Sequence, residues 1–392
     1  MSRLVAALFA SLAVVSATSA APQARITARL QSPTDAVTAG RSWKAIVLVR
    51  DGERPYSGRV SILAQGEVGR RTYAAQRAKP GRYRAQLLFP GGGSWTLHVL
   101  AGRRSARMAS IEVRGAGPRI SGPHGIEIAE AHGDLLVPDR DGTAFFEVNL
   151  RTRAKKLVAT GFDHPMFLKF GPGGFLYIVD SGRVWRFEPD GSKTPIAGNG
   201  TRGLSGDGGP ATAAQLGGPG DFAFDAAGNL YISEYDNGVR IVAPDGRIAT
   251  LAGVGRAGYS GDGGPARAAE FGAPHALDVL PDGTVFVADS HNGVIRRIDG
   301  ASRVVTTVAD GFSAPVGIDA RADGAFYVAD ARLDHIVRVA PNGARTSHGR
   351  GLDVPVTVTA DSRGNLYVSE LERRTVRRID ALTGRMSVIV RP

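Results

Sequence analysis

Cysteine is absent from all 392 residues, and this absence excludes disulfides, thiolate metal sites, Cys nucleophiles and lipid attachment through Cys. Lysine is scarce as well, with six among 48 basic residues. Beyond the first twenty residues no stretch is long and apolar enough to cross a bilayer. What remains is a Gly-rich chain of a length that suits about two domains.

The opening segment, "MSRLVAALFASLAVVSATSA", combines one Arg, a short apolar run and small residues at its end. Thr18 and Ala20 suit a cleavage site, and the apolar run is shorter than the ~20 residues that span a bilayer. We expect residues 1–20 to be a cleaved secretory signal. The mature protein is then periplasmic or secreted, with no transmembrane segment.

The net positive charge is confined to the N-terminal third. Residues 22–114 contain 17 basic and 5 acidic side chains, whereas residues 115–392 contain 30 and 32. A region this basic usually meets phosphates or acidic polymers. For an exported chain the partners would be an anionic envelope polymer or lipid headgroups, not nucleic acid. The alternative is a solvated Arg-rich surface without a partner.

The first domain, residues 22–114, has an all-β pattern. Segments such as "WKAIVLV", "GRYRAQLLF" and "WTLHVLA" alternate or run apolar between Gly, Pro and Asp turns. Five to seven short strands in this length predict a small immunoglobulin-like β-sandwich. It contains no catalytic grouping, and we interpret His98, in a strand pattern, as structural.

The second domain, residues 115–392, repeats one pattern six times, with copies beginning near residues 121, 162, 216, 271, 312 and 352. Each copy opens at a Pro, runs through a strand to a turn, continues through a strand ending in an acid, and adds two more strands. About forty residues with four strands make one propeller blade, because a sheet this small cannot bury both faces alone.

One copy, "PHALDVLPDGTVFVADSHNGVIRRID", resembles the NHL repeat. The shared features are the Pro-small-apolar start, the Asp-Gly turn, the Val-Ala-Asp strand end, and the following Asn and Arg-Ile. The resemblance implies a six-bladed NHL β-propeller. The predicted fold class is therefore all-β, a six-bladed propeller preceded by a small sandwich.

Two nearly identical stretches, "LSGDGGPATAAQL" (204–216) and "YSGDGGPARAAEF" (259–271), follow fourth strands and precede the next first strand. As phosphate-binding loops they lack the Lys and Ser or Thr that would follow. We interpret them as interblade insertions, in which the glycines turn the chain, Pro210 begins a short helix, and Leu216 and Phe271 pack into the blade junction.

Several polar residues should lie on one propeller face, where first strands begin and second strands end. Ligand sites of propellers usually lie at such a face around the channel. The candidates there are three histidines and the acid that ends each second strand: His124, His164, His275, Asp139, Asp180, Glu234, Asp289, Asp330 and Glu370. Because every blade carries such an acid, turn capping explains the six acids better than a ligand site does.

A second set of residues lies on the first strands, three positions after the residue that follows the opening Pro of each blade. This position is out of phase with the apolar positions of the strand. We expect it to line the channel. This channel column consists of Glu127, Lys169, Ala223, Asp278, Asp319 and Thr359. Glu127, Asp278 and Asp319 are the candidate catalytic acids.

The two Pro-His stretches give the sequence its metal-site alternative. His124 and His275, with His164 nearby, resemble the stretches of the NHL-type amidating lyase for hydroxyglycine peptides, and that resemblance implies a His-bound zinc. Against this, His124 and His275 fall in opposed blades, too far apart to share one ion. A calcium-dependent lactonase would need a carboxylate and amide cluster, which the sequence does not identify.

These patterns predict an exported, non-catalytic binding protein that needs no cofactor. Its propeller would hold a protein, peptide or glycan at the cell envelope. The alternative is a metal-dependent lyase or hydrolase, with zinc or calcium held through His124 and His275 and one channel acid as base. A purely structural envelope protein is the third option.

Overall fold

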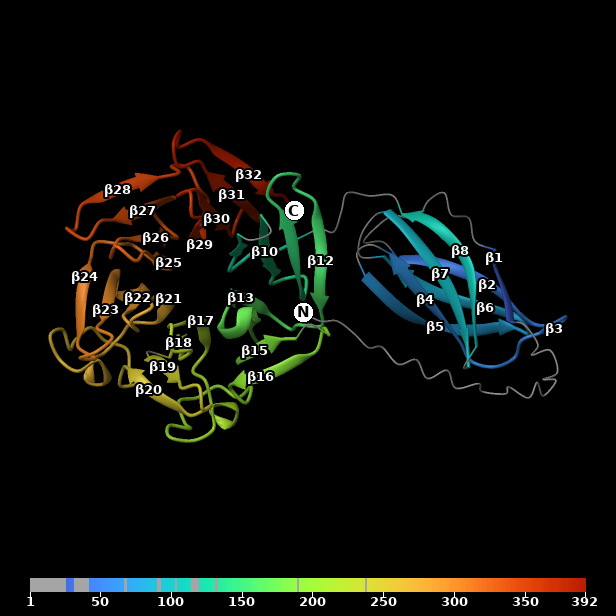
Figure 1. Cartoon of the computed structure of the whole chain (residues 1–392), viewed down its shortest axis with the longest axis horizontal. Helices are drawn as coiled ribbons and strands as arrows, with labels where there is room; N and C mark the ends of the chain where they lie inside the picture. The colour runs from blue at the N-terminus through green and yellow to red at the C-terminus, as the bar shows by residue number, and fades with distance from the viewer. Residues whose placement is uncertain are drawn as a thin grey trace, which may run out of the picture. The chain divides into compact units, whose positions relative to one another are not determined.

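The computed structural model describes residues 26–31, 42–66, 69–89, 93–102, 104–113, 120–130, 133–188, 190–236 and 238–392. They form two compact units (Figure 1). The predicted signal, residues 1–20, and the predicted domain boundary at residues 114 and 115 lie outside the described residues. Within the described part of the chain, no helix has the length and apolar character needed to cross a membrane.

The first unit consists of β-strands in the order β1-β2-β6-β5-β4-β7-β8, with β3 beside β2. Their bounds are β1 Ile26–Leu30, β2 Ser42–Asp51, β3 Arg54–Pro55, β4 Val60–Gly66, β5 Gly69–Lys79, β6 Arg82–Leu88, β7 Gly93–Ala101 and β8 Arg104–Val113. Strand β5 pairs with β4 through its first part and with β6 through its last part. It therefore joins two layers in a sandwich-like module.

Side chains of this unit alternate as the pleat of a strand requires. On β2, Ala45, Val47 and Val49 are buried, and on β4 Ile62 and Ala64 are buried. These residues form the core side of their layers, and on β4 the intervening Leu63 is buried as well. Whether the module belongs to the immunoglobulin-like class stays a prediction.

The second unit confirms the six-bladed propeller, because it contains six four-stranded sheets, each built from four consecutive strands. The blades are: first, β9 Glu127–Ala129, β10 Asp134–Asp139, β11 Ala144–Asn149, β12 Lys155–Thr160; second, β13 Pro165–Phe170, β14 Leu176–Asp180, β15 Arg183–Phe187, β16 Lys193–Ala197; third, β17 Pro219–Phe224, β18 Leu230–Glu234, β19 Gly238–Val242, β20 Ile248–Ala252; fourth, β21 Pro274–Val279, β22 Val285–Asp289, β23 Val294–Ile298, β24 Val305–Ala309; fifth, β25 Pro315–Ala320, β26 Phe326–Asp330, β27 His335–Val339, β28 Arg345–His348; sixth, β29 Pro355–Ala360, β30 Leu366–Glu370, β31 Thr375–Ile379, β32 Met386–Val390.

Hydrophobic clusters fill the six junctions between neighbouring blades. The junction between the sixth and first blades includes Tyr367 and Ile389 from one side and Ile126 and Val137 from the other. No strand is exchanged there, since all four strands of each sheet are consecutive. The ring therefore closes through side-chain packing and through hydrogen bonds such as that from Thr357 Oγ1 to the His124 carbonyl oxygen, 3.1 Å.

The two Gly-rich segments are insertions between blades that hold neighbouring blades together, as the sequence predicts. In the first, the Gly208 N–H donates to the carbonyl of Ile248 on β20, and the Gly198 N–H at the end of β16 donates to the carbonyl of Ala211. It thus joins the second blade to the outer strand of the third. A 3₁₀ turn, η2 Ala211–Ala213, follows Pro210, and Leu216 is buried. The second insertion repeats this arrangement, with η3 Ala266–Ala268 and buried Phe271.

Candidate ligand site in the propeller channel

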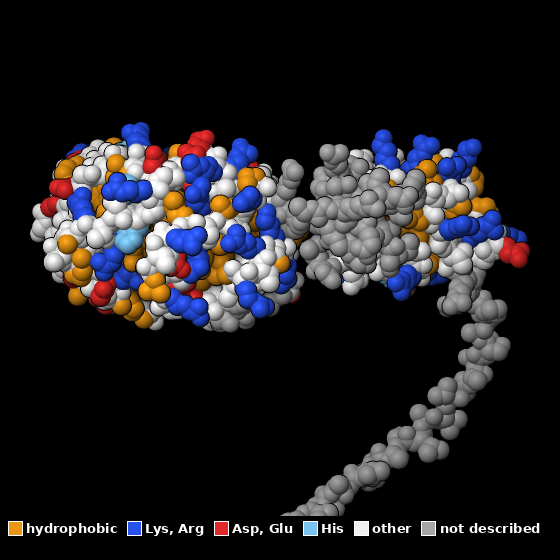
Figure 2. Space-filling view, turned by 90° about the horizontal axis from the view of Figure 1, so that it is seen from above, with side chains coloured by type: hydrophobic (Ala, Val, Ile, Leu, Met, Phe, Trp, Pro, Cys, Tyr) orange, Lys and Arg blue, Asp and Glu red, His pale blue; other side chains and the backbone are white. Residues whose placement is uncertain are grey.

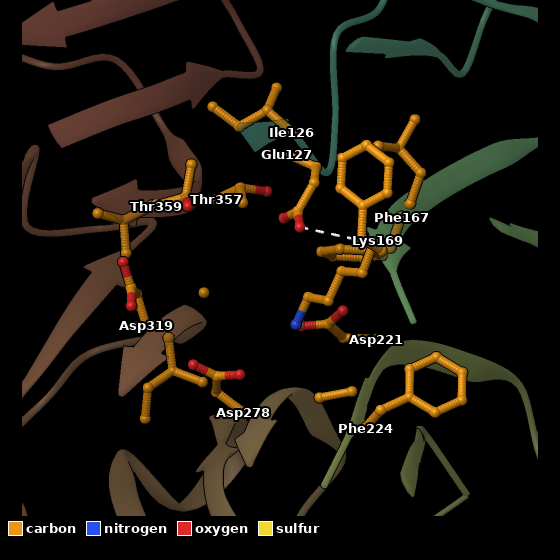
Figure 3. A pocket seen from close by; sticks show the side chains of 16 residues that line it. Ile126, Glu127, Phe167, Lys169, Asp221, Phe224, Asp278, Asp319, Thr357 and Thr359 are labelled. Carbon is orange, nitrogen blue, oxygen red and sulfur yellow. Dashed lines mark hydrogen bonds and ion pairs between the residues drawn. The ribbon is translucent and has the colours of Figure 1, made fainter. Parts of the chain in front are cut away.

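A polar cavity of about 200 Å³ lies where the inner strands of the six blades meet (Figure 3). All six residues of the channel column line it: Glu127, Lys169, Ala223, Asp278, Asp319 and Thr359. The inner strands contribute mainly their last three residues, so the cavity is near the ends of these strands. The predicted histidine face is at their beginnings.

Among the lining residues that sequence reasoning missed are Phe167, Asp221, Gly317 and Thr357. Each lies two residues before the channel column of its own blade, so both positions point to the same side of the inner strand. In the third blade the residue between them, Phe222, is fully buried in a blade junction. Asp221 could have been found, because its blade is the one whose column residue is an Ala.

The channel acids are fixed by the next blade around the ring. Asp278 Oδ2 accepts the Ala320 N–H at 2.8 Å, and Asp319 Oδ2 accepts the Ala360 N–H at 2.5 Å. Likewise, Glu127 Oε1 of the first blade accepts the Phe170 N–H of the second blade at 3.4 Å. Main-chain hydrogen bonds thus hold these carboxylates in place before any ligand arrives.

Lys169 crosses part of the cavity (Figure 3). Its Nζ lies 3.2 Å from Asp221 Oδ2 and 3.3 Å from the Leu277 carbonyl oxygen, to both of which it donates. Burial alone would lower the pKa of Lys169, but the surrounding carboxylates outweigh burial and raise it to about 12. The lysine is therefore a fixed positive charge.

Three of the surrounding acids titrate close to neutral pH. Burial raises the pKa of Glu127 to about 8 although Lys169 opposes the shift. Burial, followed by repulsion from Asp278, raises the pKa of Asp319 to about 7. Burial likewise raises the pKa of Asp221 to about 6, against the attraction of Lys169. The site can therefore change its charge with pH or with the charge of a ligand.

Phe167 lies between this cavity and the two predicted metal-binding histidines. Its ring lines the cavity and meets the His124 ring edge-on, with centroids 5.0 Å apart, and the His275 ring at 6.2 Å. Gly125 leaves room for it, since a Cβ there would be 2.4 Å from the Phe167 ring. On the far side, the Tyr235 hydroxyl is 3.0 Å from His275 Nε2.

The two histidines differ in their polar contacts, since the Tyr235 hydroxyl is bonded to His275. Burial lowers the pKa of His124 to about 3 and that of His275 to about 4, so both are neutral at pH 7. His164 is exposed, and its backbone N–H donates to Asp180. Among the described residues no group of three or more His, Asp or Glu has an arrangement that could hold a metal ion. A zinc or calcium site stays a prediction.

The six acids at the ends of the second strands are buried inside their own blades. Each accepts at least one backbone N–H from the segment that enters the blade: Gly122 to Asp139, His164 to Asp180, Gly217 to Glu234, Gly272 to Asp289, Ser313 to Asp330, and Asp353 to Glu370. This pattern favours the turn-capping interpretation, because the carboxylates are occupied by their own chain.

No family model matches the chain. Among curated proteins, residues of this chain are 34% identical over 140 residues to Teneurin-m of Drosophila melanogaster, covering 31% of this chain and 5% of that protein. They are 35% identical over 74 residues to Protein SUPPRESSOR OF QUENCHING 1, chloroplastic, of Arabidopsis thaliana, covering 18% of this chain and 7% of that protein. The chain thus spans a small part of either relative.

Solved structures match over far more of the chain. A putative gluconolactonase has a TM-score of 0.51 at 15% identity, covering 69% of this chain and 90% of its own. A streptogramin B lyase has a TM-score of 0.50 at 16% identity, covering 69% of this chain and 84% of its own. An auxiliary nutrient binding protein from Bacteroides ovatus has a TM-score of 0.50 at 11% identity, covering 94% of this chain and 99% of its own. What these share with the chain is the fold. That fold is the six-bladed β-propeller, whereas membership of the NHL family stays a prediction.

Proposed function

We propose that this protein is an exported, non-catalytic binding protein that takes the hydrophilic end of a glycan or peptide into the central cavity of its propeller. The supporting observation is the cavity itself, in which Asp278 and Asp319 are held by main-chain hydrogen bonds from neighbouring blades. Acceptors fixed in this way suit a ligand that offers several hydroxyl or ammonium donors, because little ordering is needed on binding.

The cavity mouth supports a ligand that extends beyond it. Phe170 and Phe224 line the cavity, and Phe170 is 40% exposed. An exposed aromatic ring next to polar groups can pack against a sugar ring or an apolar side chain while the donors bind inside. Structural neighbours such as the auxiliary nutrient binding protein support binding without catalysis at the level of fold.

Localisation and the second partner belong to the same proposal. The protein would act at the cell envelope, where the basic first unit would hold anionic material while the propeller binds its own ligand. The charge difference between residues 22–114 and the rest of the chain supports this division of roles.

The test is direct binding by calorimetry. The probes are glucose, glucosamine, N-acetylglucosamine, their oligomers, and dipeptides with free amino termini. At least one should bind, and Asp278→Asn together with Asp319→Asn should weaken it roughly 10- to 100-fold, because a hydrogen bond to a charged group contributes about 1.5–3 kcal/mol. Asparagine keeps an oxygen for the main-chain bonds from Ala320 and Ala360.

Asp310→Asn is the matched control, since Asp310 is exposed and directly follows β24, the outermost strand of the fourth blade. It should leave the affinity unchanged. Binding that survives the double substitution would place the ligand outside the cavity and overturn the proposal. So would a ligand that mass spectrometry finds cleaved or rearranged by the wild-type protein.

That last result would support the lyase or hydrolase alternative, which one observation favours: Glu127 and Asp319 share a cavity and titrate near neutral pH. Metal content of protein purified without chelator or affinity metal separates the two further. Near-stoichiometric zinc or calcium that is lost in His124→Ala/His275→Ala would favour the metalloenzyme.

A further inference from the structure

The outer side of β1, β2 and β6 in the first unit carries a group of arginines that the propeller site does not use. The inner side of these strands holds Ala45, Val47 and Val49. Because side chains alternate along a strand, the intervening positions face outward. The arginines on this side, which we name the arginine face, are Arg29, Arg50, Arg82 and Arg84.

Strand register places these arginines close together. Leu48 on β2 is paired with Arg29 on one side and with Arg82 on the other, and Ile46 is paired with Arg84. Paired residues have Cβ atoms about 4.5–5.5 Å apart, and rows two residues apart along a strand are separated by roughly 7 Å. Four guanidinium groups are thus gathered over adjacent rows of one sheet.

Among the described residues, no acid forms an ion pair with an arginine of this face. The strands β1, β2 and β6 include one acid, Asp51, which lies on the other side of β2 and is ion-paired with Arg104. Arg29, Arg50 and Arg84 are exposed, and none of them is ion-paired within the described residues. Figure 2 shows Lys and Arg side chains interspersed with hydrophobic ones on the visible surface of this unit.

A cavity of about 540 Å³ adjoins the arginines along β2, β6 and β5. Its lining combines two basic residues, two glutamines and several apolar residues: Lys44, Arg84, Gln76, Gln86, Ala45, Ile46, Ala74 and Ala85. A guanidinium binds carboxylate, sulfate or phosphate, amides bind hydroxyl groups, and small apolar side chains accommodate the faces of sugar rings. This set fits an acidic polysaccharide better than a flat layer of lipid headgroups.

We propose that the arginine face and its cavity bind a linear acidic polysaccharide. The proposal gives a site and a ligand class to the anionic partner of the proposed function, and it rests on that function only for the setting at the envelope. The polymer would run across the strands, with acidic groups on the arginines and sugar rings over Ile46.

The test measures binding of the full-length protein to immobilised polygalacturonate, with neutral dextran as the comparison polymer. We expect binding to polygalacturonate alone, lost between about 0.05 and 0.5 M salt, where the screening length falls from above to below about 10 Å. Arg29→Gln/Arg50→Gln/Arg84→Gln should weaken it about tenfold, which corresponds to about 1.4 kcal/mol.

The control variant is Arg54→Gln/Arg59→Gln/Arg70→Gln, which removes the same charge from exposed positions of the same unit outside the arginine face. It should change the affinity by less than about twofold. Equal weakening by both triple variants would mean that bulk charge binds the polymer and would overturn the site. Binding to vesicles of anionic phospholipid without binding to polygalacturonate would also overturn it.

The propeller ligand separates this proposal from the proposed function. If the arginine-face variant binds the cavity ligand normally while polygalacturonate binding fails in the wild type, only the present inference is wrong. If the Asp278→Asn/Asp319→Asn protein binds the cavity ligand as tightly as the wild type, while the arginine-face variant binds polygalacturonate more weakly, only the propeller function is wrong.

Discussion

At the scale of single residues, the channel shows how burial and charge set the chemistry of a site. Glu127, Lys169 and Asp319 occupy equivalent positions in three blades, yet one is a fixed cation and two are acids that hold protons near neutral pH. The repeat determines the position, whereas burial, followed by the charged neighbours, determines how each side chain is protonated. Repeat position alone therefore does not reveal function.

Glu127 gives a stability prediction with a defined sign. Its pKa is about 8 in the folded protein, against about 4.3 in an unfolded chain. Between these values the folded state keeps a proton that the unfolded state has lost, so stability decreases as pH rises, by about 1.4 kcal/mol per unit. Glu127→Gln should therefore flatten the fall in unfolding free energy between pH 7 and 8, measured by denaturant titration.

The window from pH 7 to 8 avoids the titration of His124 and His275. Their lowered pKa values act in the opposite direction, because the unfolded chain takes up protons as pH falls below about 6.5. Glu372→Gln, at an exposed position, should keep the wild-type slope. Parallel profiles for Glu127→Gln and the wild type would show that Glu127 is already ionised at pH 7.

At the scale of elements, each insertion contributes an acid that holds a buried arginine of the following blade. Arg296 on β23 is fully buried, and its Nη2 donates to Asp262 Oδ1 at 2.8 Å. Arg240 on β19 pairs with Asp207 at the same distance. Each insertion therefore supports the core of the blade that follows it.

Asp262→Asn should lower the free energy of unfolding by about 1–3 kcal/mol, because it leaves the buried Arg296 charge less compensated. The carbonyl oxygens of Ser260 and Glu270, and Asp289 at 3.7 Å, limit the loss. Asp310→Asn, which removes an exposed ion pair with Arg345, should cost below about 1 kcal/mol. Denaturant unfolding measures both, and equal losses would contradict a core role for the insertion.

The blades and the insertions could be predicted from the sequence because their signals repeat. Six openings at Pro and six acid-ended second strands fix the register, so the alternation of each inner strand then places Asp278 and Asp319 in the channel. Phe167 and Asp221 stand at a repeat position where the other blades carry Gly, Ala or Thr, so periodicity does not mark them. For Asp221 the sequence offers one other signal, the Ala at the channel column of its blade.

Side-chain contacts across the channel could not be predicted from the sequence either. The contact of Phe167 with His124 and His275 joins three blades, and it depends on the space left by Gly125. The spacing of residues along the chain does not indicate which inner strand supplies the side chain that occupies the centre. Likewise the pKa of Lys169 depends on acids from other blades.

At the scale of the whole molecule, the propeller is a closed ring with one junction that the chain does not bridge. Five junctions join consecutive blades, and two of these are reinforced by the insertions. The junction between the sixth and first blades is held by its hydrophobic cluster and by hydrogen bonds such as Lys155 Nζ to the Arg391 carbonyl oxygen, 2.7 Å. Opening at this junction releases packing without stretching a short linker, so it should be the lowest-energy local opening.

Hydrogen exchange tests this expectation. Ile389→Ala removes a buried side chain from the closing junction, and Ile298→Ala removes one from the junction of the third and fourth blades. Each should cost about 2–5 kcal/mol of packing. Ile389→Ala should speed exchange in the first and sixth blades while the third and fourth stay protected, whereas Ile298→Ala should lower protection throughout the ring. Uniform acceleration by both variants would mean that the propeller opens only as a whole, with the closing junction as tightly coupled as the covalently linked ones.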